Sequence, residues 1–149
     1  MKLAKIGLAA AALLGATLVP LSIATPAQAA SCSGSQIDTI AVKRGSSTYG
    51  SLKLYYNSST GNNCARLDRV VDYGTKSGMI LSLYACAKGQ TQSQCFQNYR
   101  GLDQDSGQFG QYAGPVSVYG KGRCILVQAG VADRNHNWAN YTSPVFHCG

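Results

Sequence analysis

The chain has 149 residues, of which 13 are lysine or arginine and six are aspartate, and it contains no glutamate. Only 13% of the residues are charged and 45% are hydrophobic. This composition excludes a disordered tail, a coiled coil and a long charged helix, each of which needs more charge, and the length allows one domain.

The first 29 residues have the pattern of a secretory signal peptide. Two lysines precede an apolar run over 6–24, and Ala27-Gln28-Ala29 offers small residues to a signal peptidase. A membrane anchor is the alternative, but Pro20 and the Ala-x-Ala site argue against it. We therefore expect cleavage after Ala29 and a single secreted β-domain over 30–149 with no further membrane span. Loss of the two lysines leaves 11 basic residues against six aspartates, a net charge of +5.

The mature part contains six cysteines, an even number that predicts three disulfides in an oxidising compartment. No C-x-x-C spacing occurs, so the sequence does not indicate a zinc knuckle or a redox pair. Fifteen connectivities are possible. We expect sequential pairing, because a short polar turn separates the middle two cysteines and the outer pairs each bracket two apolar segments. The six positions are Cys32, Cys64, Cys86, Cys95, Cys124 and Cys148.

Along the mature chain, short apolar runs with a period of two predict β-strands. These runs lie at 37–43, 52–56, 64–71, 79–87, 115–119, 123–129 and 141–148. Between them, 45–50, 57–63, 72–78 and 99–114 have the composition of turns and loops. A short helix over 95–100 is compatible with the sequence. The expected fold is all-β, a small disulfide-stapled β-sandwich or barrel of about six to eight short antiparallel strands.

Catalytic patterns are scarce. Glycoside hydrolysis needs paired carboxylates, but Asp38, Asp72, Asp103 and Asp105 lie in or beside expected turns, where aspartate commonly serves the backbone. Asp68 could pair with either Arg66 or Arg69. We therefore expect no carboxylate pair that acts in acid–base chemistry.

The two histidines also lack a predicted partner. His136 falls in the polar stretch Asp133-Arg134-Asn135-His136-Asn137, and His147 adjoins the last cysteine. There is no G-x-S-x-G nucleophile motif. We expect no catalytic residues, and a small hydrolase is the weakest of the functional hypotheses.

No cofactor is expected. The stretch Asp103-Gln104-Asp105-Ser106-Gly107 begins like a calcium loop, but Gly107 stands where a further ligand is needed and no bidentate glutamate exists. A plain turn is favoured there, and no phosphate-binding glycine loop occurs.

The excess of basic residues is dispersed, with only Lys43 and Arg44 adjacent. A nucleic-acid-binding module would have a basic cluster or stripe, so the predicted partners are components of the cell envelope, not nucleic acid. The nine tyrosines raise the hypothesis of carbohydrate stacking, although alternation within strands predicts that many of them pack in the core or across strands.

Two blocks of sequence resemble a known family. They are Gly50-x-Leu52-x-Leu54-x-Tyr56-Asn57-Ser58-Ser59-Thr60-Gly61-x-Asn63-Cys64 and Tyr112-Ala113-Gly114-Pro115-Val116-x-Val118-Tyr119-x-x-Gly122-x-Cys124. Together with the final Cys148-Gly149, they resemble the spore-associated protein A family of Streptomyces and related actinobacteria. The segment from Cys86 to Gly110 departs from this pattern.

The resemblance implies a small exported protein of the spore or hyphal surface with no established enzymatic activity. It also implies that Cys32, Cys64, Cys124 and Cys148 form a shared framework, to which Cys86 and Cys95 are added. We accordingly expect a non-enzymatic protein associated with the spore or cell surface, with no assigned binding residues. The alternative is a secreted inhibitor or antimicrobial binding protein that presents the segment 88–94 as a loop tied by its flanking cysteines.

Overall fold

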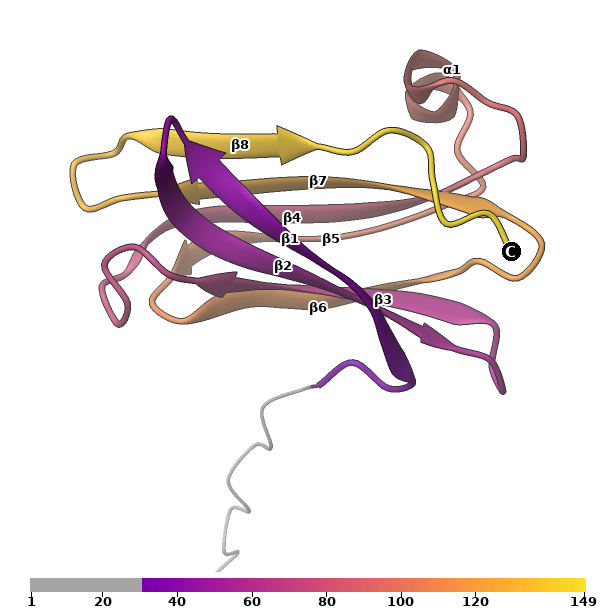
Figure 1. The fold of residues 1–149 in the computed structure, drawn as a ribbon, viewed down its shortest axis with the longest axis horizontal. Coiled ribbons are helices and arrows are strands. Elements are labelled where there is room, and N and C mark those ends of the chain that lie inside the picture. The colour runs from indigo at the N-terminus through magenta and orange to yellow at the C-terminus, as the bar shows by residue number, and fades with distance from the viewer. Residues whose placement is uncertain (1–30) are drawn as a thin grey trace, which may run out of the picture.

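The computed structural model describes residues 31–149, which form two antiparallel four-stranded sheets packed face to face (Figure 1). The strand order is β1-β2-β3-β6 in sheet A and β5-β4-β7-β8 in sheet B. The prediction of a small disulfide-stapled all-β fold is confirmed, and of the two expected architectures the structure has the sandwich. The signal peptide predicted over 1–29 lies outside the described residues.

Eight strands and one short helix make up this part of the chain. In chain order they are β1 (Ser35–Arg44), β2 (Ser47–Asn57), β3 (Asn62–Arg69), β4 (Ser77–Cys86), α1 (Gln92–Gln97), β5 (Gly101–Phe109), β6 (Tyr112–Tyr119), β7 (Cys124–Ala132) and β8 (Trp138–Thr142).

The core lies between the sheets and is built from alternate residues of the strands. In β2, Leu52 and Leu54 are buried while Lys53 between them is partly exposed, as period-two patterning requires. Sheet B contributes the inner faces of β4 and β7, which carry the longest apolar runs. The fully buried side chains with the largest volumes include Leu52, Leu67, Met79, Leu81, Leu83, Ile125, Val127 and Val131.

The prediction of a loop over 99–114 is wrong, because most of this segment forms β5 and the start of β6. Its two aspartates, Asp103 and Asp105, point toward β6 and replace the apolar residues that an inner strand face would carry. Ser117 N donates to Asp103 Oδ2 at 2.8 Å, and Gly114 N donates to Asp105 Oδ2 at 2.7 Å. These bonds join β5 of sheet B to β6 of sheet A through the aspartate side chains. The inner face of β5 is therefore polar, and the segment lacks the hydrophobic alternation that identifies a strand in the sequence.

The helix and the last strand also differ from their predicted bounds. The helix starts earlier than expected, because Thr91 and Gln94 form a capping box that fixes its first turn. The last strand was expected over 141–148, but β8 ends at Thr142. Beyond it, Ser143 Oγ accepts the bond from Val127 N at 2.9 Å and Pro144 has no N–H to donate, so the ladder stops. Ser143 N still donates to Val127 O at 3.0 Å, and the chain next pairs with β7 at an isolated bridge between Ile125 and Phe146.

The cysteines pair in sequence order, as predicted, and the described residues contain no free cysteine. Each bond joins a strand in the interior of a sheet to a segment outside the sheets. Cys64 of β3 holds the chain before β1, Cys86 of β4 holds α1, and Cys124 of β7 holds the C-terminal tail. The three bonds are Cys32–Cys64, Cys86–Cys95 and Cys124–Cys148.

One buried arginine links the two sheets at the end where β3 finishes. Arg69 is 3% exposed, and burial lowers the pKa of its guanidinium. The guanidinium donates to Ala132 O at 2.8 Å, Ser77 O at 3.0 Å and Phe109 O at 3.2 Å, which belong to β7, β4 and β5. Arg69 therefore satisfies the carbonyl groups of three strands of sheet B from its place in sheet A.

We predict that Arg69→Met lowers the free energy of unfolding by about 3 kcal/mol or more, because several buried carbonyl groups lose a charged donor. Urea denaturation measures the loss. Arg66→Met on the same strand is the matched control. Arg66 is partly exposed and shares Asp68 with Lys53, so its removal should cost no more than about 1 kcal/mol. Equal losses for the two variants would contradict the role assigned to Arg69.

Candidate functional site

The aspartates, which are the possible acids or bases, lie against hydrogen-bond donors of the fold. Arg66 Nε donates to Asp68 Oδ1 at 2.7 Å, and Lys53 Nζ lies 2.8 Å from Asp68 Oδ2. Hydrogen bonding to Asp68 raises the pKa of the Lys53 ammonium. Of the two arginines that the sequence left open for Asp68, the structure selects Arg66, since Arg69 is committed to backbone carbonyl groups.

Two further aspartates connect distant parts of the chain. Asp72 lies in the turn before β4, as expected, and Arg134 donates to it through Nε at 2.8 Å and through its backbone N–H at 2.9 Å. These bonds lower the pKa of Asp72. Asp38, which was expected in or beside a turn, lies instead within β1, next to an irregularity in the pairing with β2.

The two histidines lie at opposite ends of the sandwich. His136 is exposed in the loop between β7 and β8, whereas His147 lies in the C-terminal tail beyond the other end of β8 (Figure 1). His147 Nε2 is 3.2 Å from Asp38 Oδ2, and its ring lies 4.4 Å from that of Phe146. The contact with Asp38 fastens the tail to β1. Within residues 31–149, no hydroxyl group hydrogen-bonds to either histidine ring.

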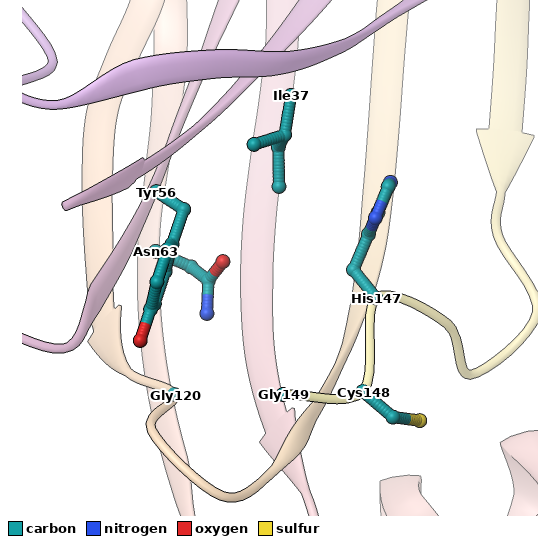
Figure 2. Close-up of a pocket in the computed structure, with 7 residues that line it drawn as sticks. All are labelled: Ile37, Tyr56, Asn63, Gly120, His147, Cys148 and Gly149. Atoms are coloured by element: carbon teal, nitrogen blue, oxygen red, sulfur yellow. The ribbon is translucent and has the colours of Figure 1, made fainter. Parts of the chain in front are cut away.

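A pocket of about 230 Å³ opens beside this tail (Figure 2). Tyr56 and Asn63 of sheet A lie on one side of it, and His147 and Cys148 lie on the other. Cys148 is held in a disulfide and Asn63 is buried. The pocket therefore brings together a phenol, a carboxamide and an imidazole, groups that can bind a small polar ligand, without a positioned nucleophile.

The loop between β7 and β8 is organised around the buried carboxylate of Asp133. Asn135 N and Asn137 N donate to Oδ1 at 2.9 and 2.8 Å, and Asn137 Nδ2 and Tyr49 Oη donate to Oδ2 at 2.9 and 3.1 Å. The side-chain bond from Asn137, with the backbone and Tyr49 bonds, lowers the pKa of Asp133 from 3.8 to about 2. The loop, which the sequence showed only as a polar stretch, is thus a rigid support for the start of β8.

No group of three or more potential metal-ligating side chains occurs among residues 31–149. The stretch from Asp103 to Gly107, expected to be a turn and weighed as a calcium loop, is part of β5, and its two carboxylates bind backbone N–H groups of β6.

The segment tied by Cys86 and Cys95 folds as a turn followed by the first turn of α1. A polar hollow of about 380 Å³ lies on it, lined by Lys88, Gln90 and Gln94 among others. Gln92 Nε2 donates to Ser143 O at 2.8 Å, which ties α1 to the chain after β8. This region stands out from one end of sheet B (Figure 1).

Neither the burial of the Arg69 cation nor the exposure of the Trp138 ring was predicted from the sequence. Trp138 is the single tryptophan of the chain, and it starts a strand whose alternate residues are all uncharged. That alternation, repeated over 102–108 with aspartate only at the intervening positions, is the signal that could have identified an uncharged sheet face.

The chain matches no protein-family model, no curated protein and no solved structure. No helix in residues 31–149 has the length and apolar character needed to cross a membrane.

We predict that Asp133→Asn lowers stability near neutral pH, because the amide turns a donor toward N–H groups that need an acceptor. In the wild type, the depressed pKa of Asp133 contributes stability that is present above the ordinary value of 3.8 and is lost as pH falls toward about 2. Denaturation of both proteins at a series of pH values should therefore give a difference that shrinks in this window. A difference that stays constant with pH would contradict the prediction.

Proposed function

We propose that this chain is a non-enzymatic, exported β-sandwich protein associated with the surface of the cell or spore. One observation carries the proposal: all six aspartates and His147 hydrogen-bond to groups of the fold itself. A general acid or base must be able to reach a substrate proton, and these side chains are instead committed to loops, strand edges and the tail. The fold is thereby favoured as a rigid scaffold for binding.

The disulfides support an extracytoplasmic location. Three such bonds in a small domain are typical of secreted and cell-surface proteins and rare in the cytoplasm. They are consistent with an extracellular protein, and the signal pattern over 1–29 supports the same location.

The dispersed cations favour an envelope component over nucleic acid as the partner. Lys53 and Arg66 share Asp68, Arg134 is paired with Asp72, and Arg69 is buried. These contacts reduce the number of cations free to follow a phosphate backbone.

The inhibitor alternative is less favoured by the local geometry. A loop that blocks a protease commonly presents an extended backbone to the enzyme, as in β-strand addition. The segment 88–94 is instead a turn that leads into a capped helix.

We predict that the mature, oxidised protein sediments with cell walls, hyphae or spores of the producing organism and stays bound in about 0.5 M NaCl, where surface charge is largely screened. Fractionation of cultures and re-addition of purified protein to washed envelopes measure this. The matched control is the same protein added to washed envelopes of an unrelated bacterium. Recovery in the medium alone, with no binding on re-addition, would refute surface association.

A further inference from the structure

Sheet B has an outer face that carries no charged side chain. We define this outer face as the side chains of β4, β5, β7 and β8 that point away from sheet A. The four strands contain two charged residues, Asp103 and Asp105, and both bind β6 on the inner side. The strands of sheet A, in contrast, carry Asp38, Lys43, Arg44, Lys53, Arg66, Asp68 and Arg69.

Carboxamides and hydroxyl groups supply the hydrogen-bonding side chains of the outer face. The pairing register places Gln104 and Gln128 on either side of Ser82, and Asn140 beside Gly130. Gln104 and Asn140 are exposed, and Gln128 is partly so. A carboxamide both donates and accepts hydrogen bonds without charge, which suits it to hydroxyl groups. Tyr84 Oη donates to Gln128 Oε1 at 3.1 Å, which fixes the orientation of that carboxamide.

Trp138 provides an aromatic surface at one end of this face. Its ring lies across β4 and β7, over two glycines that leave room for it. A Cβ added to Gly78 would lie 2.6 Å from Trp138 Cζ2, and one added to Gly130 would lie 3.2 Å from Trp138 Cζ3. The side chain is nevertheless 38% exposed. The ring is thus held against the sheet by backbone atoms while part of it is open to a ligand.

A hollow of about 300 Å³ lies on this face, lined by Ile80, Gln128, Asn140 and Thr142 and by Gly130, the glycine over which the Trp138 ring lies. Successive same-face residues of a strand are about 6.7 Å apart, so the row from Trp138 through Asn140 to Thr142 extends about 13 Å. The hollow therefore has apolar lining at Ile80 and uncharged polar side chains at Gln128, Asn140 and Thr142. The Trp138 ring lies on the same face of β8 as Asn140 and Thr142.

The other end of the face is bounded by α1. The Tyr84 ring packs edge-on against Phe96 of the helix at 5.2 Å and against Tyr99 at 5.7 Å. The disulfide from Cys86 to Cys95 anchors the helix to β4. Figure 1 places α1 at the end of sheet B opposite the β7–β8 loop. Trp138 directly follows that loop as the first residue of β8. The outer face therefore lies between the Trp138 ring at one end and helix α1 at the other.

The charge distribution distinguishes among possible ligands. A polyanion is attracted to the basic parts of a protein with a surplus of positive charge, and this face offers it no cation. A sugar ring instead has an apolar C–H surface for an aromatic ring and hydroxyl groups for carboxamides, the combination of apolar contact and a few placed polar groups that ligand sites use. Building on the surface association argued above, we infer that the outer face of sheet B binds an uncharged polysaccharide of the envelope.

The binding test uses the oxidised mature protein with cellulose, chitin and the neutral polysaccharide fraction of the producer's envelope. Retention on at least one of them is expected. Soluble oligosaccharides prepared from the retaining polysaccharide should change the fluorescence saturably, because Trp138 is the only tryptophan. Trp138→Ala should weaken retention about tenfold, which corresponds to about 1.4 kcal/mol.

A second variant guards against a folding defect in Trp138→Ala. Asn140→Asp keeps the shape of an exposed side chain and adds a charge that a neutral ligand cannot compensate, so it should also weaken retention about tenfold. Gln36→Glu places the same charge change on exposed β1 of sheet A and should leave retention unchanged. Tyr73→Ala, which removes a 66% exposed aromatic ring from a loop, should do the same.

Several outcomes would overturn the inference. They are no retention on any of the three polysaccharides, equal retention of the wild type, Trp138→Ala and Asn140→Asp, or self-association of the protein that Asn140→Asp abolishes. If the wild type still sediments with envelopes, surface association survives and only this face is excluded. If the wild type binds no envelope, surface association itself fails.

Discussion

The packing of the two inner sheet faces is the interaction on which this molecule depends, because no disulfide crosses from one sheet to the other. Leu52 and Leu67 of sheet A face Leu81, Leu83 and Val127 of sheet B in one continuous core. Burial of such side chains stabilises the fold by about 1.5–3 kcal/mol each relative to exposure. The sandwich therefore forms through its apolar alternation, and the covalent bonds act on a structure that the core already specifies.

The disulfides and two polar contacts then restrain the segments outside the sheets and the two ends of the sandwich, which the core does not hold in place. Each disulfide restrains a segment outside the sheets, which limits the conformations of the unfolded chain and keeps the peripheral segment close to its strand. Arg69 bonds the sheets together at one end, while Asp38 and His147 fasten the tail near the other. A rigid frame follows, in which the position of α1 and the orientation of the β7–β8 loop are both set by named bonds.

The sequence predicted the core strands well and the edges poorly, for a physical reason. In β2, β4 and β7 one face is buried, so the hydrophobic period identifies the strand without knowledge of its partner. In β5 both faces are polar, and its strand character comes from pairing with β4 and from the bonds that Asp103 and Asp105 accept. The candidate binding face could not be predicted from the sequence either. Gln104, Ser82 and Gln128 become neighbours only through the pairing register of β5, β4 and β7.

The edge strands of sheet B, β5 and β8, have backbone groups that could pair with the edge of a second molecule, and the structure limits that risk. Inward-pointing charges and short edge strands are known means of preventing such pairing. At one edge, Asp103 and Asp105 turn inward and occupy backbone N–H groups of β6. At the other edge, β8 is five residues long, and the backbone irregularity at Ser143 and Pro144 ends it. Charge is thus placed where it blocks pairing and is absent from the face itself, an arrangement that leaves neutral side chains exposed to a ligand without inviting a second copy of the sheet.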